Sequence, residues 1–215
     1  MTASLSLSGR AADTRLRLRV DAGLAEPGQV RLEGLSPVPF GRPVFILVSP
    51  EGRSADATLV FPRDRRVISE GSAEAIIEAL TGIALTPDEL RTILSGCGLG
   101  AGVPSSGRAY DGGWMALEQD GSTSWLRQAD GAWHTRAVVR GPLEIRYDEF
   151  DSFRPSRIRL RTSSTAAIPA DITLRVSDVD INVPLGPDVF RVNVPEGSIP
   201  MTVAELRRHL HNGER

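Results

Sequence analysis

The sequence predicts a mainly β protein of the α+β class, an incomplete antiparallel barrel wrapped around a helical hairpin that lids an apolar cavity. Three observations predict this fold. Apolar and polar residues alternate over much of the chain, as in sheets with one buried and one solvated face. Glycine and proline, 21 and 15 of 215 residues, are frequent enough for many turns. Short amphipathic helices interrupt the strands.

The clearest strand is Arg15–Asp21, in which arginine and aliphatic residues alternate without a break. Similar patterns recur and predict about eleven strands, with the helical hairpin inserted after the fourth. The further segments are residues 30–34, 44–49, 57–61, 114–118, 124–128, 133–140, 143–147, 157–162, 171–178, 179–183 and 189–194. Asp120-Gly121 and Asp130-Gly131 each separate two of these segments, which is typical of tight hairpin turns.

Capping signals mark the starts of the helices. The first helix covers about residues 72–81. The second begins at Thr86, which forms a capping box with Glu89, and Gly96 ends it. A third helix near the C-terminus begins with the same box at Thr202. These boundaries place the two hairpin helices next to each other in the chain.

The apolar stripes of the two hairpin helices predict an apolar cavity. Two short helices cannot cover the apolar face of such a wide sheet, so we expect the sheet to curl around them and leave a space. The residues expected to face this space are Ile76, Ile77, Leu80, Leu90, Ile93 and Leu94.

Composition excludes several classes of function. The 25 basic and 27 acidic residues give a net charge of −2, which argues against a nucleic-acid partner. Three histidines and one cysteine argue against a structural zinc site and internal disulfides, and we expect no cofactor. No segment approaches the ~20 apolar residues of a membrane span, and the first ten residues do not resemble a signal peptide.

Short motifs do not indicate an enzyme. Residues 96–101 match a dinucleotide-binding pattern, but they follow a helix instead of a strand. Residues 94–97 match a lipobox, but they lie in the middle of the chain. The sequence has no Gly-x-Ser-x-Gly motif, and we expect a structural role for His134. We therefore expect no enzymatic activity.

The segment between two predicted strands, residues 35–43, is apolar and contains three prolines. Connecting loops are normally polar, so this composition suggests contact with a membrane, a lipid or a partner. An equally weighted interpretation is a loop that folds back as a plug on the mouth of the barrel. The residues expected to make the membrane contact are Leu35, Val38, Pro39 and Phe40.

Several of these segments resemble the LolA/LolB family of lipoprotein carriers. Residues 73–85, with their Leu-Thr-Gly turn, and residues 87–96 resemble the helical hairpin of LolB, the outer-membrane receptor. Residues 39–41, Pro-Phe-Gly, resemble its protruding Pro-Leu-Gly loop. Residues 190–197 look more like the end of LolA, the soluble carrier. Recognisable motifs cover about a third of the chain, so the resemblance is mainly one of fold.

The resemblance implies a single lipid-binding domain over residues 1–215, expected to be a periplasmic monomer. In this family an apolar cavity takes the acyl chains of lipoproteins on their way to the outer membrane. The implied partners are lipid or lipoprotein acyl chains, a membrane surface and a LolA-like carrier. The given chain shows no anchor cysteine near its start, so an outer-membrane anchor would belong to a longer precursor.

Two alternatives share the same scaffold. One is a carrier of another lipid, such as a hopanoid, a sterol or a phospholipid. The other is a structural or assembly module whose barrel is filled by its own side chains. Organic extracts of the native protein distinguish these alternatives, because only a carrier retains lipid.

The substitution Phe40→Glu tests the loop. If Phe40 inserts into bilayers, the charge abolishes liposome association and leaves the melting temperature nearly unchanged, because exposed positions contribute little to stability. If Phe40 is a plug on the barrel, the substitution costs a few kcal/mol of stability. Liposome co-sedimentation and thermal unfolding distinguish the two; a large stability loss with unchanged liposome binding contradicts the membrane role.

Overall fold

The computed structural model describes residues 1–36, 42–50, 56–99 and 102–211. Of residue 211 it describes the backbone only. The predicted fold class is confirmed: these residues form one large, mainly antiparallel sheet that curls without closing, together with helices. The sheet has 14 strands in the spatial order β14-β6-β5-β4-β3-β2-β1-β13-β12-β11-β10-β9-β8-β7.

The strands are β1 (Thr2–Ala11), β2 (Thr14–Ala25), β3 (Gln29–Leu35), β4 (Pro43–Ser49), β5 (Thr58–Phe61), β6 (Arg66–Ile68), β7 (Ser106–Tyr110), β8 (Trp114–Gln119), β9 (Ser122–Ala129), β10 (Ala132–Arg140), β11 (Leu143–Asp151), β12 (Arg154–Thr162), β13 (Ala170–Asp180) and β14 (Ile199–Pro200). The helices are α1 (Ala73–Thr81), α2 (Pro87–Ser95) and α3 (Val203–His211), with a 3₁₀ turn η1 (Pro187–Phe190).

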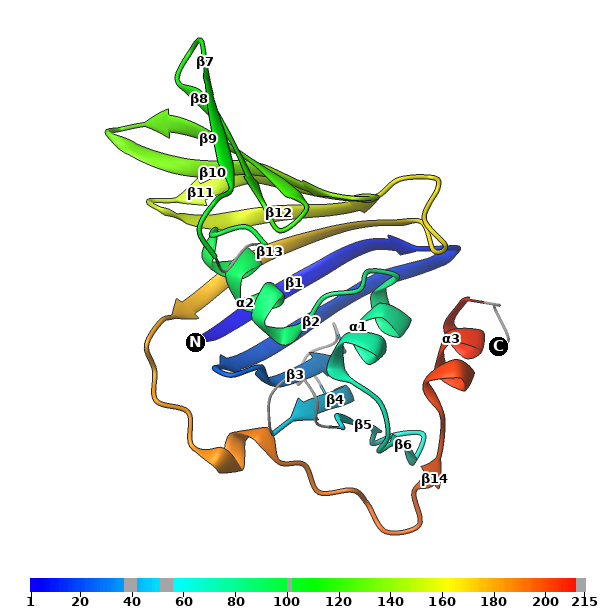
Figure 1. The fold of residues 1–215 in the computed structure, drawn as a ribbon. Helices are drawn as coiled ribbons and strands as arrows, with labels where there is room; N and C mark the ends of the chain where they lie inside the picture. Colours follow the sequence, from blue (N-terminus) through cyan, green and yellow to red (C-terminus); the bar gives the residue numbers. More distant parts are fainter. Residues whose placement is uncertain (37–41, 51–55, 100–101, 212–215) are drawn as a thin grey trace.

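Two meanders share this sheet. Strands β1 to β6 succeed one another in one direction, and β7 to β13 succeed one another until β13 pairs with β1. The antiparallel pairing of β1 and β13 therefore joins the two meanders at the centre. Figure 1 shows α1 and α2 on the concave side of the sheet, while β7–β10 extend beyond them as a separate wing. The short β14 differs from the other strands in running parallel to its neighbour, β6.

The alternation along β2 is confirmed. Arg15, Arg17 and Arg19 are exposed, whereas Leu16 and Leu18 pack against the core. Both predicted hairpin turns also form, between β8 and β9 and between β9 and β10, with positive φ angles at both residues of each Asp-Gly pair. Such angles suit the right-handed twist of the flanking strands.

The predicted helix starts are confirmed by their hydrogen bonds. The Thr86 Oγ1 accepts from the Glu89 amide at 3.2 Å, and the Glu89 carboxylate accepts from the Thr86 amide at 2.9 Å. The same reciprocal pair of bonds forms between Thr202 and Glu205. Gly96 ends α2 in the left-handed conformation, which glycine adopts without steric cost.

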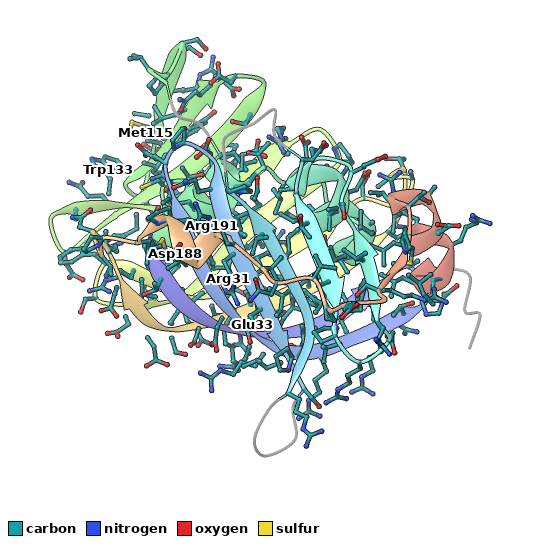
Figure 2. All side chains as sticks on the ribbon, turned by 90° about the horizontal axis from the view of Figure 1, so that it is seen from below. Arg31, Glu33, Met115, Trp133, Asp188 and Arg191 are labelled. Carbon is teal, nitrogen blue, oxygen red and sulfur yellow. The ribbon has the colours of Figure 1, made fainter. Side chains whose placement is uncertain are left out.

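The segment from 181 to 198, which we call the strap, was predicted to contain a strand over residues 189–194, and this prediction is wrong. The strap leaves β13, crosses the outer face of β3 through η1 and reaches β14 (Figures 1 and 2). The Arg31 guanidinium donates to the carbonyls of Val189 and Arg191, at 3.2 and 3.1 Å. Phe190 is buried with 1% exposure, so its apolar character reflects packing beneath a turn instead of strand alternation.

Four strands lie outside the predicted set: β1, β6, β7 and β14. The helical hairpin consequently follows the sixth strand of the chain and not the fourth. Strands β6 and β14 have only three and two residues, and β7 is exposed along its whole length. Such strands bury too little apolar surface to produce a periodic hydrophobic pattern.

The centre of the sheet generates a prediction about Gly9. Its φ is +147°, and a Cβ atom there would lie 2.1 Å from the backbone oxygen of Asp171 in β13. We expect Gly9→Ala to lower the free energy of unfolding by roughly 2–5 kcal/mol, because β1 and β13 would have to separate. Urea denaturation measures this loss. The control is Gly186→Ala, whose Cβ would meet no atom within 4 Å; equal stabilities of the two variants would contradict the prediction.

Candidate functional site: an apolar cavity beneath the helices

An apolar cavity of about 330 Å³ lies between the concave face of the sheet and the helices. Its volume falls at the lower end of the ~300–1,000 Å³ range of small-molecule pockets. Aliphatic side chains from both meanders and from the helices line it. They include Leu5, Leu7, Leu16, Leu18, Leu32, Ile83, Leu160, Ile172 and Leu174. Among the described residues that line it, only Phe45 and Phe61 are aromatic, so most of the described wall is aliphatic.

The six predicted cavity residues all belong to the core between the helices and the sheet. Ile77, Leu80 and Leu90 line the cavity itself. Ile76, Ile93 and Leu94 lie behind its wall, at 0%, 0% and 1% exposure. Helix periodicity identified the buried face, but it could not tell which residues of that face contact the sheet and which border empty space. Their role in lipid binding stays a prediction.

Of the predicted loop residues, Val38, Pro39 and Phe40 lie outside the described residues. Leu35 ends β3, is half-buried and lines the cavity. The two ends of the loop meet, since the Ser36 amide donates to the Arg42 carbonyl at 3.3 Å. The loop therefore starts and ends at the edge of the cavity.

The mouth of the cavity lies along the free part of β2. Strand β3 ends at Leu35, opposite Arg19, so no strand among the described residues pairs with residues 14–18 of β2 on this side. Arg15 and Arg17 border the cavity here, together with Val44 of β4. Because β2 continues past the end of β3, the sheet leaves an opening instead of a closed wall.

Helix α3 forms the opposite rim of this mouth. Leu210 lines the cavity, and its carbonyl accepts a hydrogen bond from the Thr14 hydroxyl at the start of β2. Arg207 forms an ion pair with Glu78 of α1. These two polar contacts and the buried side chain of Leu206 hold α3 against α1 and the start of β2.

A second, polar pocket of about 490 Å³ lies at the start of α2. Four of its charged groups form two ion pairs: Arg91 pairs with Glu26 at 2.6 Å, and Arg140 pairs with Glu89. The Gly28 amide also donates to Asp88 at 3.1 Å. These contacts fix α2 to the β2–β3 turn and to β10, so we assign the pocket a structural role.

Titratable side chains contribute little reactive chemistry to the cavity. Within the described ranges, no three His, Cys, Asp or Glu side chains lie close enough together to hold a metal ion. Burial raises the pKa of the Tyr147 phenol, so this group stays protonated at neutral pH. His134 lies on the wing, stacked on Phe153 at 5.8 Å and edge-on to Phe150 at 5.4 Å. What the cavity offers a ligand is apolar surface.

Solved structures with this fold include a LolA superfamily protein from Nitrosomonas europaea. It superimposes with a TM-score of 0.59 at 14% identity, over 89% of each chain. A DUF1329 family protein from Desulfovibrio piger gives a TM-score of 0.51 at 9% identity, over 88% of each chain. An outer membrane lipoprotein-sorting protein domain from Vibrio parahaemolyticus gives a TM-score of 0.49 at 12% identity, over 88% of each chain.

The first two similarities show the fold, which is the one that the predicted resemblance to LolA-like proteins implies. The nearer resemblance to LolB stays a prediction. No protein-family model matches this sequence, and a search of curated proteins finds no match. Among the described helices, none is long and apolar enough to cross a membrane.

The position of Leu80 at the cavity wall predicts tolerance of a larger side chain. We expect Leu80→Trp to change the free energy of unfolding by no more than about 1 kcal/mol, because the indole enters empty space. Ile76→Trp, four residues earlier in the same helix and fully buried, should cost about 3 kcal/mol by overpacking. Thermal and urea unfolding of both variants compare them; the reverse order of stabilities would mean that the cavity is not where we place it.

Proposed function

We propose that this protein is a non-enzymatic lipid carrier of the cell envelope that holds an acyl chain in the cavity beneath α1 and α2. The observation that carries the proposal is the mainly aliphatic lining of the 330 Å³ cavity. A dry, shape-tolerant surface suits flexible hydrocarbon better than a rigid polar metabolite. The likeness to the LolA superfamily fold supports the same function.

The size of the cavity sets the scale of binding. If a methylene group fills about the ~30 Å³ that a water molecule takes in the liquid, the cavity holds on the order of ten methylenes. Burial of about ten methylenes contributes roughly 8 kcal/mol, which corresponds to a dissociation constant near micromolar before ordering costs. The reversible membrane binding of a single myristoyl chain has an association constant of about 10⁴ M⁻¹, so the cavity is able to compete with a bilayer for such a chain. We therefore expect the cavity to bind an acyl chain reversibly and to exchange it with a bilayer.

The mouth between β2 and α3 offers an acyl chain a route into the cavity. Movement of α3 requires the loss of the Thr14–Leu210 hydrogen bond and the Arg207–Glu78 ion pair, and it exposes the buried Leu206, while the core beneath α1 and α2 stays in place. An exposed ion pair contributes only ~0–1 kcal/mol, so most of the free energy needed to move α3 comes from exposing Leu206, at about 1.5–3 kcal/mol for a buried leucine. We infer that α3 controls entry, and that α1 and α2 form the fixed roof.

The cargo and the location complete the proposal. We infer a periplasmic carrier that receives the acyl chains of lipoproteins and transfers them toward the outer membrane, by likeness to the family that the sequence resembles. A carrier of another lipid would use the same cavity. Mass spectrometry of organic extracts from protein purified from its native host decides between these cargos, and an extract without any lipid would favour a structural module.

Binding of a neutral apolar dye tests the cavity directly. We expect N-phenyl-1-naphthylamine to bind with a micromolar dissociation constant, and Leu80→Trp to weaken binding at least tenfold, because the indole occupies the space of the ligand. The control is Ile181→Trp, at a position that is 49% exposed and outside the cavity lining. Fluorescence titration measures all three proteins. Equal affinity of the wild type and Leu80→Trp would overturn the carrier function.

A further inference from the structure

The outer face of the central strands carries a row of arginines, and most of them are neutralised. Arg159 and Arg161 of β12 both contact Asp171 of β13, at 2.8 and 3.2 Å. Arg157 of β12 and Arg175 of β13 share Glu149. On β2, Arg19 pairs with Asp21 at 3.3 Å. Each of these guanidinium groups has a carboxylate within ion-pair distance.

Three arginines at the cavity mouth depart from this pattern. Arg10 of β1 and Arg15 and Arg17 of β2 are exposed, and within the described residues none has a carboxylate within 4 Å. The carboxylate opposite Arg10 in register is Asp171, which Arg159 and Arg161 already hold. Asp13 lies in the turn between the two strands and forms no ion pair with them. The three positive charges are therefore uncompensated.

The register of β1 and β2 brings two of these positive charges next to each other, which lowers the stability of the sheet. Arg10 and Arg15 are direct cross-strand partners, and like charges in that position are destabilising. Arg15 and Arg17 lie two residues apart on one strand, so they project from the same face at a spacing of about 7 Å. One anionic group between them can accept hydrogen bonds from both guanidinium forks.

The position of these arginines connects them to the cavity. Arg15, Leu16 and Arg17 line the apolar cavity, and the same three residues also line a hollow of about 620 Å³ on the outer face, with Arg10 at its far side. A single stretch of β2 thus separates an apolar space from a positively charged one. A molecule that fills both must have a hydrocarbon chain and an anionic end.

We propose that Arg15 and Arg17, with Arg10 beside them, bind the anionic head group of a lipid whose hydrocarbon chain occupies the cavity. This inference rests on the proposed function and specifies its ligand class: an anionic lipid, as opposed to a neutral or zwitterionic one. The ligand neutralises the arginines in the way that Glu149 and Asp171 neutralise those of β12 and β13.

The test compares two lysolipids with the same twelve-carbon chain, lysophosphatidylglycerol and lysophosphatidylcholine. Each displaces N-phenyl-1-naphthylamine from the full chain at 50 mM NaCl. We expect the anionic lipid to bind about tenfold more tightly than the zwitterionic one, and 500 mM NaCl to remove most of this difference by screening. The double substitution Arg15→Gln and Arg17→Gln should remove the preference, so that the affinities for the anionic and the zwitterionic lipid come within twofold of each other.

The control is Arg175→Gln, which removes an exposed arginine from the same outer face, away from the mouth. It should leave all affinities unchanged. Melting temperatures of the variants confirm that they fold, and since Arg15 and Arg17 are exposed, we expect shifts of no more than a few degrees.

The outcomes separate this inference from the proposed function. If the dye does not bind to the wild type, both the proposed carrier function and the head-group site are wrong. If the dye binds but the two lysolipids displace it equally, or the double variant keeps the preference, the carrier function stands and the head-group site is wrong. Binding of glycerol 3-phosphate as tight as that of the anionic lysolipid would show a site for a free anion. Loss of binding to phosphatidylglycerol vesicles without loss of lysolipid affinity would show a membrane-docking surface. Either result overturns the inference.

Discussion

The pairing of β1 with β13 is the constraint on which the rest of the structure depends. Without this ladder, the chain would form two separate meanders, each with an apolar face that its own helices could not cover. The ladder requires close approach at Gly9, where any side chain would meet the backbone of β13. Once the meanders are joined, their apolar faces form one concave surface, and α1 and α2 pack onto it from the connection between them.

The cavity follows from a mismatch of areas. Two nine-residue helices cover part of a concave surface to which strands of both meanders contribute. Ile76 and Ile93 fill the space directly beneath their helices, whereas Leu80 and Leu90 reach only its border. Apolar atoms that line an empty space lack van der Waals partners on that side. A hydrocarbon ligand in the cavity would supply these partners and the dispersion energy of the contacts.

Electrostatics on the outer face separate structural arginines from candidate functional ones. Where an arginine holds two strands together, a carboxylate or a backbone carbonyl accepts from it, as with Arg159 and Asp171 or with Arg31 and the strap. The hydrogen bond from Arg159 lowers the pKa of the Asp171 carboxyl, so this pair persists until the solution is strongly acidic. Arg15 and Arg17 have no such partner among the described residues, and they lie where the sheet opens.

The sequence by itself determined the local structure: the β2 alternation, the Asp-Gly hairpins and the capping boxes at Thr86 and Thr202 arise from neighbouring residues. It also identified the buried face of both helices, because helix periodicity is local. The tertiary structure alone decided that β1 pairs with β13, that the strap buries the side chain of its own Phe190, and that Leu80 borders the cavity while Ile76 does not. Those features depend on contacts between residues far apart in the chain. The position of the opening is likewise decided by the sheet, because β3 ends before its partner β2 does.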